Sequence, residues 1–138
     1  MADARRSGIR DTSHARVLIV DDDFDSAEVM SILLERAGFE VQVALKASSA
    51  LLVVDEFIPN VAIIDIGLPE VSGYELVQAL RAKPALRACL YIAVTGYSGE
   101  ALSERSANAG FETHLTKPVS PMDLIQLLHE MVATAQSS

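Results

Sequence analysis

The stretch Val61-Ala62-Ile63-Ile64-Asp65-Ile66-Gly67-Leu68-Pro69 decides the fold class of this 138-residue chain. Its first four residues are apolar and mostly β-branched, which is typical of a strand that is buried on both faces of a parallel sheet. A carboxylate follows the run at once, and a turn containing glycine and proline comes next. We therefore expect a buried strand over 61–64 with Asp65 at its carboxyl end.

Three more short apolar runs are followed directly by polar side chains. Val17 to Val20 precede Asp21, Asp22 and Asp23; Tyr91 to Val94 precede Thr95; and Phe111 to Thr116 precede Lys117. The carboxyl ends of parallel strands share one edge of the sheet, and ligands bind outside that edge. We therefore expect carboxylates, a hydroxyl and an ammonium group to meet at one place.

Helix-like segments separate the runs, so the chain consists of five strand–helix units. This alternation is typical of an α/β fold, a doubly wound parallel sheet with helices on both faces. The expected strands are 16–20, 40–44, 61–64, 90–94 and 111–115. The expected helices are about 25–37, 47–57, one from Ser72 to Lys83-Pro84, 99–109, and one that starts at Pro121 after a Ser120 cap. The first helix should bury Val29, Ile32, Leu33 and Ala37.

The bulk composition limits the possible functions. The length fits one domain, with residues 1–15 as a flexible tail, 16–134 as the domain and 135–138 as a second tail. A net charge of −8 argues against a nucleic-acid-binding surface, which is normally basic. The single cysteine, Cys89, indicates a reducing compartment, and neither a membrane-length apolar stretch nor a signal core is present. We therefore expect a cytoplasmic protein without a membrane partner.

Asp21, Asp22 and Asp65 form the acidic part of the expected site. Two like charges about 4 Å apart repel by about 1–4 kcal/mol, depending on the effective dielectric constant. Such a cluster either raises carboxylate pKa values or recruits a cation, and Mg²⁺ fits because it takes few carboxylates and keeps several waters. The plainer interpretation, helix capping and solvation, suits Asp23 and Asp25 better.

Asp65, Thr95 and Lys117 each have a plain and a chemical interpretation. The plain ones are a turn carboxylate, a β-branched strand residue and a solvated surface lysine. The chemical ones are a nucleophile that takes a phosphoryl group, a hydroxyl in the crevice and an ammonium that reaches an anion on Asp65. Their common position after strands favours a metal-assisted phosphoryl site.

Four motifs occur in order, each at the end of an expected strand: Val-Leu-Ile-Val-Asp-Asp-Asp from residue 17, Asp65-x-x-Leu68-Pro69 with Gly73, Val94-Thr95-Gly96, and Lys117-Pro118. Each motif is weak alone, and the set is specific. Through them, residues 16–133 resemble the receiver domain of bacterial two-component response regulators. The resemblance implies a flavodoxin-like (βα)5 fold with strand order 2-1-3-4-5.

The resemblance also implies a role for each residue of the expected site. The residues that carry the chemistry would be the phospho-acceptor Asp65, with Thr95 and Lys117 binding the phosphoryl oxygens. The Mg²⁺ ligands would be Asp21, Asp22, Asp65 and the backbone carbonyl of Gly67. The domain would catalyse only its own phosphorylation and slow dephosphorylation, so it would not be an enzyme acting on outside substrates.

Partners follow from the same resemblance. The phosphoryl donor would be a phosphohistidine on a sensor histidine kinase or a phosphotransfer domain. The signal would leave through the face made by the fourth helix, fifth strand and fifth helix, toward an unknown output protein, because no output domain follows the last helix. Asp-Ile-Gly-Leu-Pro from Asp65 and His-Leu-Thr-Lys-Pro-Val from His114 are similar to receivers of hybrid histidine kinases.

The chain departs from the family pattern near the expected site. His114 stands three residues before Lys117, where receivers often carry the Tyr or Phe of a rotamer switch. Gly96 replaces a commoner Ala, and Tyr97 and Gly67 occupy positions that commonly tune the lifetime of the acyl phosphate. By contrast, the resemblance implies a cis bond before Pro118.

Two other functions remain open at this level. A small Mg²⁺-dependent phosphohydrolase would use the same aspartyl nucleophile, but such enzymes place an acid/base Asp two residues later, where this chain has Gly67. A phosphorylation-independent interaction module would have lost part of the site, whereas all five site positions are intact here.

Overall fold

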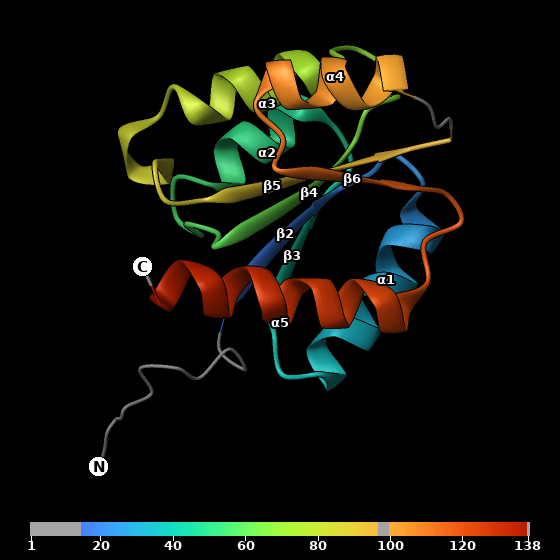
Figure 1. The fold of residues 1–138 in the computed structure, drawn as a ribbon, viewed down its shortest axis with the longest axis vertical. Helices are drawn as coiled ribbons and strands as arrows, with labels where there is room; N and C mark the ends of the chain where they lie inside the picture. Colours follow the sequence, from blue (N-terminus) through green and yellow to red (C-terminus); the bar gives the residue numbers. More distant parts are fainter. Residues whose placement is uncertain (1–14, 97–99, 138) are drawn as a thin grey trace.

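The computed structural model describes residues 15–96 and 100–137 and has a central parallel sheet with helices on both faces (Figure 1). The strands are β2 Arg16–Val20, β3 Glu40–Ala44, β4 Val61–Asp65, β5 Leu90–Thr95 and β6 Thr113–Thr116. The helices are α1 Phe24–Arg36, α2 Ala47–Val53, α3 Gly73–Arg81, the short 3₁₀ helix η2 Pro84–Leu86, α4 Glu100–Ala109 and α5 Pro121–Ser137.

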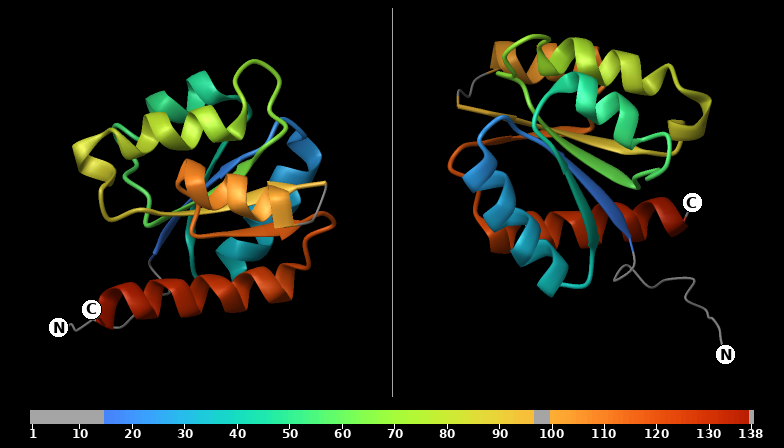
Figure 2. Two further views of the ribbon diagram at one scale, coloured as in Figure 1. Left: turned by 45° about the horizontal axis from the view of Figure 1, so that its top comes forward. Right: turned by 180° about the vertical axis from the view of Figure 1, so that it is seen from behind.

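All four strand pairs are parallel, and the order β3-β2-β4-β5-β6 confirms the predicted 2-1-3-4-5 topology. Helices α2, α3 and α4 cover one face of the sheet, while α1 and α5 cover the other (Figures 1 and 2). None of the helices among the described residues has the length and apolarity needed to cross a bilayer.

The central strands are buried on both faces, as their continuous apolar sequences predict. Alternate residues of a strand point to opposite faces, so Leu18 and Ile64 join one core under α2, α3 and α4. Val17 and Ile63 join a second core under α1 and α5. All five residues of β4 are buried, including Asp65 at its end.

The predicted buried stripe of α1 was wrong in part. Val29 and Ile32 are 58% and 42% exposed, and the buried residues of the helix are Ala27 and Leu34. The segment carries apolar residues around much of its circumference, so periodicity alone did not select the face. The sheet selects the face with the small Ala27, which allows close approach of the helix.

Several element ends differ from the prediction. Helix α2 ends at Val53 instead of residue 57, because the next amides bond three residues back as turns, Asp55 N to Leu52 O and Glu56 N to Val53 O. Strand β6 begins at Thr113 because the preceding Phe111 N bonds to Ser106 O and closes α4.

Of the two predicted tails, the structure describes only Ala15 and residues 135–137. Helix α5 continues to Ser137, so the segment expected to be a tail from 135 is helical as far as that residue. Ala15, assigned to the first tail, is buried, and its carbonyl accepts a hydrogen bond from Glu40 N. Residues 1–14 and Tyr97 lie outside the described residues.

Candidate functional site

Backbone hydrogen bonds hold the carboxyl ends of the strands together. Ile66 N donates to Val94 O at 2.9 Å, which joins the end of β4 to β5. Lys117 N donates to Thr95 O at 2.8 Å, which joins the end of β5 to the segment after β6. The polar residues that follow these strands therefore lie at one edge of the sheet, as their sequence positions predict.

The side chain of Asp65 is buried at this edge and held by two hydrogen bonds. It is 7% exposed. Its Oδ2 accepts a hydrogen bond from Lys117 Nζ at 2.9 Å, and its Oδ1 accepts one from Gly67 N at 2.9 Å. Both oxygens are thus held in place by donors from separate segments of the chain, which fixes the orientation of the carboxylate.

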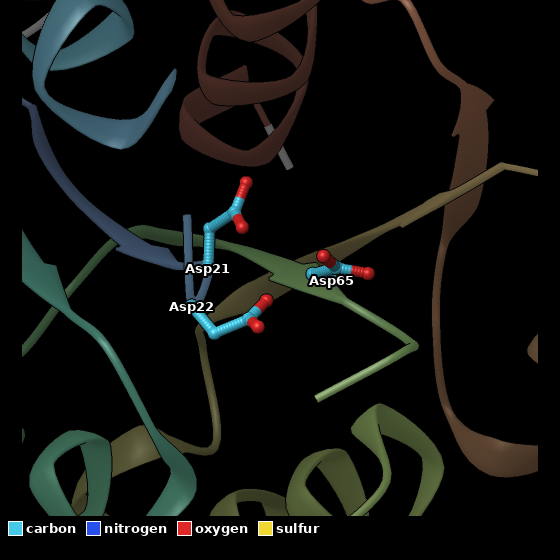
Figure 3. Close-up of side chains that lie close together, drawn as sticks. All are labelled: Asp21, Asp22 and Asp65. Atoms are coloured by element: carbon cyan, nitrogen blue, oxygen red, sulfur yellow. The ribbon is translucent and has the colours of Figure 1, made fainter. Parts of the chain in front are cut away.

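Asp21 and Asp22 lie beside Asp65, just past the end of the neighbouring strand β2 (Figure 3). One carboxylate oxygen from each of the three residues lies within 4.8 Å of the others. Burial raises the pKa of Asp21, and the nearby Asp65 and Asp22 charges add to that effect, while the Asp23 N–H and Lys117 oppose it. The hydrogen bond to Asp65 and the Asp21 and Asp22 charges raise the pKa of Lys117.

The donor set of this cluster fits a hard divalent cation. Three carboxylates offer oxygen ligands from a small volume, and the ammonium of Lys117 is bonded to one of them. Asp22 is exposed and Asp65 is buried, so one side of the cluster faces solvent. Mg²⁺ keeps several of its waters when it binds to proteins, and the solvent side leaves room for them.

Asp23 does not belong to this cluster. Its side chain accepts a hydrogen bond from Ser26 N and a second one, at 2.9 Å, from Ser26 Oγ, and it is the N-cap of α1. These hydrogen bonds lower its pKa. The prediction that Asp23 caps the helix is confirmed.

Two glycines shape the loop after Asp65. A Cβ atom at Gly67 would lie 3.6 Å from Asp65 Oδ1, an ordinary contact, so position 67 faces the carboxylate. A Cβ atom at Gly73 would lie 2.7 Å from Ile66 Cα and 2.8 Å from Asp65 O, which is too close. Sequence reasoning noted Gly73 as part of a motif and missed this contact. Its signal was the Ser-Gly step at the start of α3.

Thr95 and His114 occupy the predicted places on β5 and β6. Thr95 is buried at the end of β5. His114 is half-buried and pairs in register with Ala93, so it points to the face of the sheet that α3 and α4 cover. The bond between Lys117 and Pro118 is cis, as predicted.

A groove of about 680 Å³ opens beside the acidic cluster, between the start of α1 and the start of α5. Its lining includes Asp21, Asp25, Met30, Lys117 and Leu124. It was not foreseen from the sequence, because it depends on how two helices far apart in the chain lie next to each other. Two residues of the site, Asp21 and Lys117, line this groove.

Comparisons with known proteins agree with this geometry. A family model described as the response regulator receiver domain matches residues 17–129. The DNA-binding response regulator MtrA of Mycolicibacterium smegmatis is 32% identical over 115 residues, which cover 83% of this chain and 49% of that protein. This chain therefore spans about half the length of that relative.

Two further similarities cover nearly the whole of the other protein. The polar-differentiation response regulator DivK of Brucella ovis is 31% identical over 119 residues, 86% of this chain and 97% of that protein. A crystal structure of a CheY-like response regulator receiver domain protein from Methanospirillum hungatei matches with a TM-score of 0.82 and 33% identity, over 90% of this chain and 98% of that one.

Proposed function

Since this chain belongs to the family of response regulator receiver domains, which are phospho-accepting switches of two-component signalling systems, we propose that Asp65 is its phospho-acceptor. The observation that carries the proposal is the fixed carboxylate, buried and held by Lys117 Nζ and Gly67 N at 2.9 Å each. A carboxylate held in one orientation beside a cation is prepared for in-line attack on phosphorus.

The proposed reaction moves one phosphoryl group. An oxygen of Asp65 attacks the phosphorus of a phosphohistidine, the P–N bond breaks, and the imidazole nitrogen leaves with the electron pair and takes up a proton. The product is an acyl phosphate on Asp65. Lys117, already bonded to this carboxylate, and the hydroxyl of Thr95 bind the phosphoryl oxygens. Attack of water on the phosphorus later restores the carboxylate.

A magnesium ion is part of the proposal. Asp21, Asp22, Asp65 and the backbone carbonyl of Gly67 would hold it, and the oxygen-only cluster within 4.8 Å fits such an ion. When bound, Mg²⁺ offsets negative charge on the phosphoryl oxygens. Burial raises the pKa of Asp21, and a cation bound there would favour its charged form.

Receiver domains accept their phosphoryl group from histidine kinases or phosphotransfer proteins. We propose that the groove between α1 and α5 gives this donor access to Asp65, and that the signal leaves through the face of α4, β6 and α5 to a separate output protein. The buried thiol of Cys89 suits a reducing compartment, and the proposed location is the cytoplasm.

The proposed phospho-acceptor is tested with small-molecule donors. Incubation with Mg²⁺ and acetyl phosphate or phosphoramidate should add one phosphoryl group to the wild-type protein, measured by intact-mass spectrometry. Asp65→Asn should abolish this addition, because an amide oxygen is a poor nucleophile and its acyl phosphate cannot form. Removal of Mg²⁺ with a chelator should slow the wild-type reaction strongly.

The matched control is Asp55→Asn, which changes an exposed carboxylate that pairs with Lys83 away from the site. It should be phosphorylated like the wild type. Absence of phosphorylation in the wild type with Mg²⁺ present, or phosphorylation that persists in Asp65→Asn, would show that the assignment is wrong.

A further inference from the structure

Two buried hydroxyl groups lie on α3 and α4, two helices that contact each other. Tyr74 on α3 is 8% exposed and Ser106 on α4 is 2% exposed. Within residues 15–96 and 100–137, neither hydroxyl oxygen has a hydrogen-bond partner. A buried polar group without a partner loses its hydration and regains nothing. Each of the two hydroxyls therefore raises the free energy of the folded state with α4 in its present position.

Ring contacts hold the same place together. The guanidinium carbon of Arg105 lies 4.2 Å from the centroid of the Tyr74 ring, and Phe111 meets that ring edge-on at 6.4 Å. Both arrangements are attractive. We call Tyr74, Arg105, Ser106 and Phe111 the α3–α4 seam. It is stabilised by the face of the tyrosine ring and destabilised by the hydroxyl groups.

Both helices of the seam follow strands that end at the proposed phosphoryl site. Tyr74 directly follows Gly73, whose Cα packs against Ile66 and the Asp65 carbonyl and whose N–H donates to Ile66 O at 3.0 Å. Helix α4 starts five residues after Thr95, at Glu100. A displacement of the Asp65–Ile66 backbone is therefore passed to the first turn of α3, and from there to the tyrosine ring against α4.

We propose that Tyr74 is a positioning residue that couples phosphorylation of Asp65 to the position of α4. In the closed seam described here, the two hydroxyls are unbonded; in an open seam, with α4 moved away from α3, both hydroxyls reach water. The unphosphorylated protein favours the closed seam and the phosphorylated protein the open one. This inference rests on the proposed function of Asp65.

Because the two equilibria are linked, the coupling can be measured either at α4 or at the phosphorylation of Asp65. If phosphorylation favours the open seam, then any change that stabilises the closed seam must disfavour phosphorylation to the same extent. Tyr74→Phe and Ser106→Ala each remove an unbonded hydroxyl and keep the rest of the side chain, so both should stabilise the closed seam. Arg105→Gln removes the cation from the ring face and should stabilise the open one.

Tyr91→Phe is the matched control. Tyr91 is also fully buried, and among the described residues its hydroxyl has no nitrogen or oxygen hydrogen-bond partner, only a weak contact with the Cys89 thiol. Its ring lies under Arg81 on α3, at 4.7 Å, rather than against α4. This variant should therefore stabilise the fold to a similar extent without a specific effect on α4.

The first experiment uses the unphosphorylated full chain and measures amide hydrogen exchange. Tyr74→Phe and Ser106→Ala should raise the protection of α4 amides about tenfold, the effect expected for removing an unbonded buried hydroxyl. Arg105→Gln should lower it. Unchanged protection in the first two variants, or an equal rise at α4 in Tyr91→Phe, would overturn the strained seam.

The second experiment measures the initial rate of phosphorylation by phosphoramidate with Mg²⁺. Tyr74→Phe and Ser106→Ala should lower this rate about threefold or more, because only part of the about tenfold shift toward the closed seam appears in the rate. Arg105→Gln should raise the rate. If the variants alter amide exchange of α4 but are phosphorylated at the same rate as the wild type and Tyr91→Phe, the proposed coupling is wrong. Absence of phosphorylation in the wild type would instead contradict the function proposed for Asp65, while the exchange data still report on the seam.

Discussion

At the scale of single residues, the site depends on backbone contacts as much as on its charged groups. Asp65 can accept hydrogen bonds from Gly67 N and Lys117 Nζ only if the loop after β4 follows one path. Gly73 permits that path, because its Cα packs against the Asp65 carbonyl, leaving no room for a side chain.

Gly73→Ala should destabilise the fold by about 2 kcal/mol or more, since the added methyl group meets backbone that cannot move cheaply. It should also slow phosphorylation, because relief of the clash displaces Asp65. Urea unfolding and the phosphoramidate rate measure the two effects. Gly96→Ala is the control: a Cβ there meets nothing within 4 Å, so stability should change by less than about 0.5 kcal/mol. Equal effects of both variants would contradict this account.

The acidic cluster should make the stability of the protein depend on Mg²⁺. Binding to the folded state alone stabilises it by mass action, so the melting temperature should rise with Mg²⁺ concentration. Asp22→Ala should remove most of this rise, because it deletes one of three clustered carboxylates. Asp25→Ala, which changes an exposed carboxylate outside the cluster, should keep it. A full Mg²⁺ response in Asp22→Ala would place the metal elsewhere.

At the scale of helices and strands, capping residues near the site can be mistaken for ligands. Asp21, Asp22 and Asp23 are adjacent and have the same chemistry, yet the structure separates them. Asp23 accepts hydrogen bonds at the start of α1, whereas the other two lie with Asp65. A helix cap and a metal ligand should respond differently when the carboxylate charge is removed.

Asp23→Ala should destabilise α1 by about 1 kcal/mol, the usual loss when a helix loses its N-cap side chain. Asp23→Asn should keep nearly all of the stability, because Asn also caps well, and it should keep the full Mg²⁺-induced rise in melting temperature. Thermal unfolding with and without Mg²⁺ measures both. A reduced Mg²⁺ response in Asp23→Asn would make Asp23 a ligand.

At the scale of the whole molecule, the fold buries a thiol whose reactivity distinguishes the folded from the unfolded protein. Cys89 is buried beside β5, and burial raises the pKa of its thiol from 9.0 to about 12. The folded state thus favours the protonated thiol. The resulting stability is fully present below about pH 9 and is lost as the pH rises toward 12.

Alkylation of Cys89 should follow from this shift. At about pH 9 the folded protein should react with iodoacetamide about a hundredfold or more slowly than the urea-unfolded chain, since the thiolate is the reactive form and is scarce in the folded state. Because Cys89 is the only cysteine, mass spectrometry reads the modification directly. Comparable rates for the folded and unfolded protein would contradict the burial of this thiol.

The sequence by itself determined the strand–helix alternation, the parallel sheet and the residues at its carboxyl edge. Short apolar runs and the polar groups that follow them are local signals, and the edge of a parallel sheet collects such groups whatever the details of packing. The family motifs added the strand order, which the structure confirms. Helix caps at Asp23 and Ser72 were likewise predictable, because a cap depends on neighbouring residues.

Only the tertiary structure decided which faces and ends the elements use. The buried side of α1 depends on the sheet beneath it, so Val29 and Ile32 are exposed although their spacing suggested burial. The close packing of Gly73 on Asp65, the groove between α1 and α5, and the ring of Tyr74 against Arg105 join residues distant in the chain. Such contacts arise from the packing of whole helices against the sheet, and no local pattern of residues encodes them.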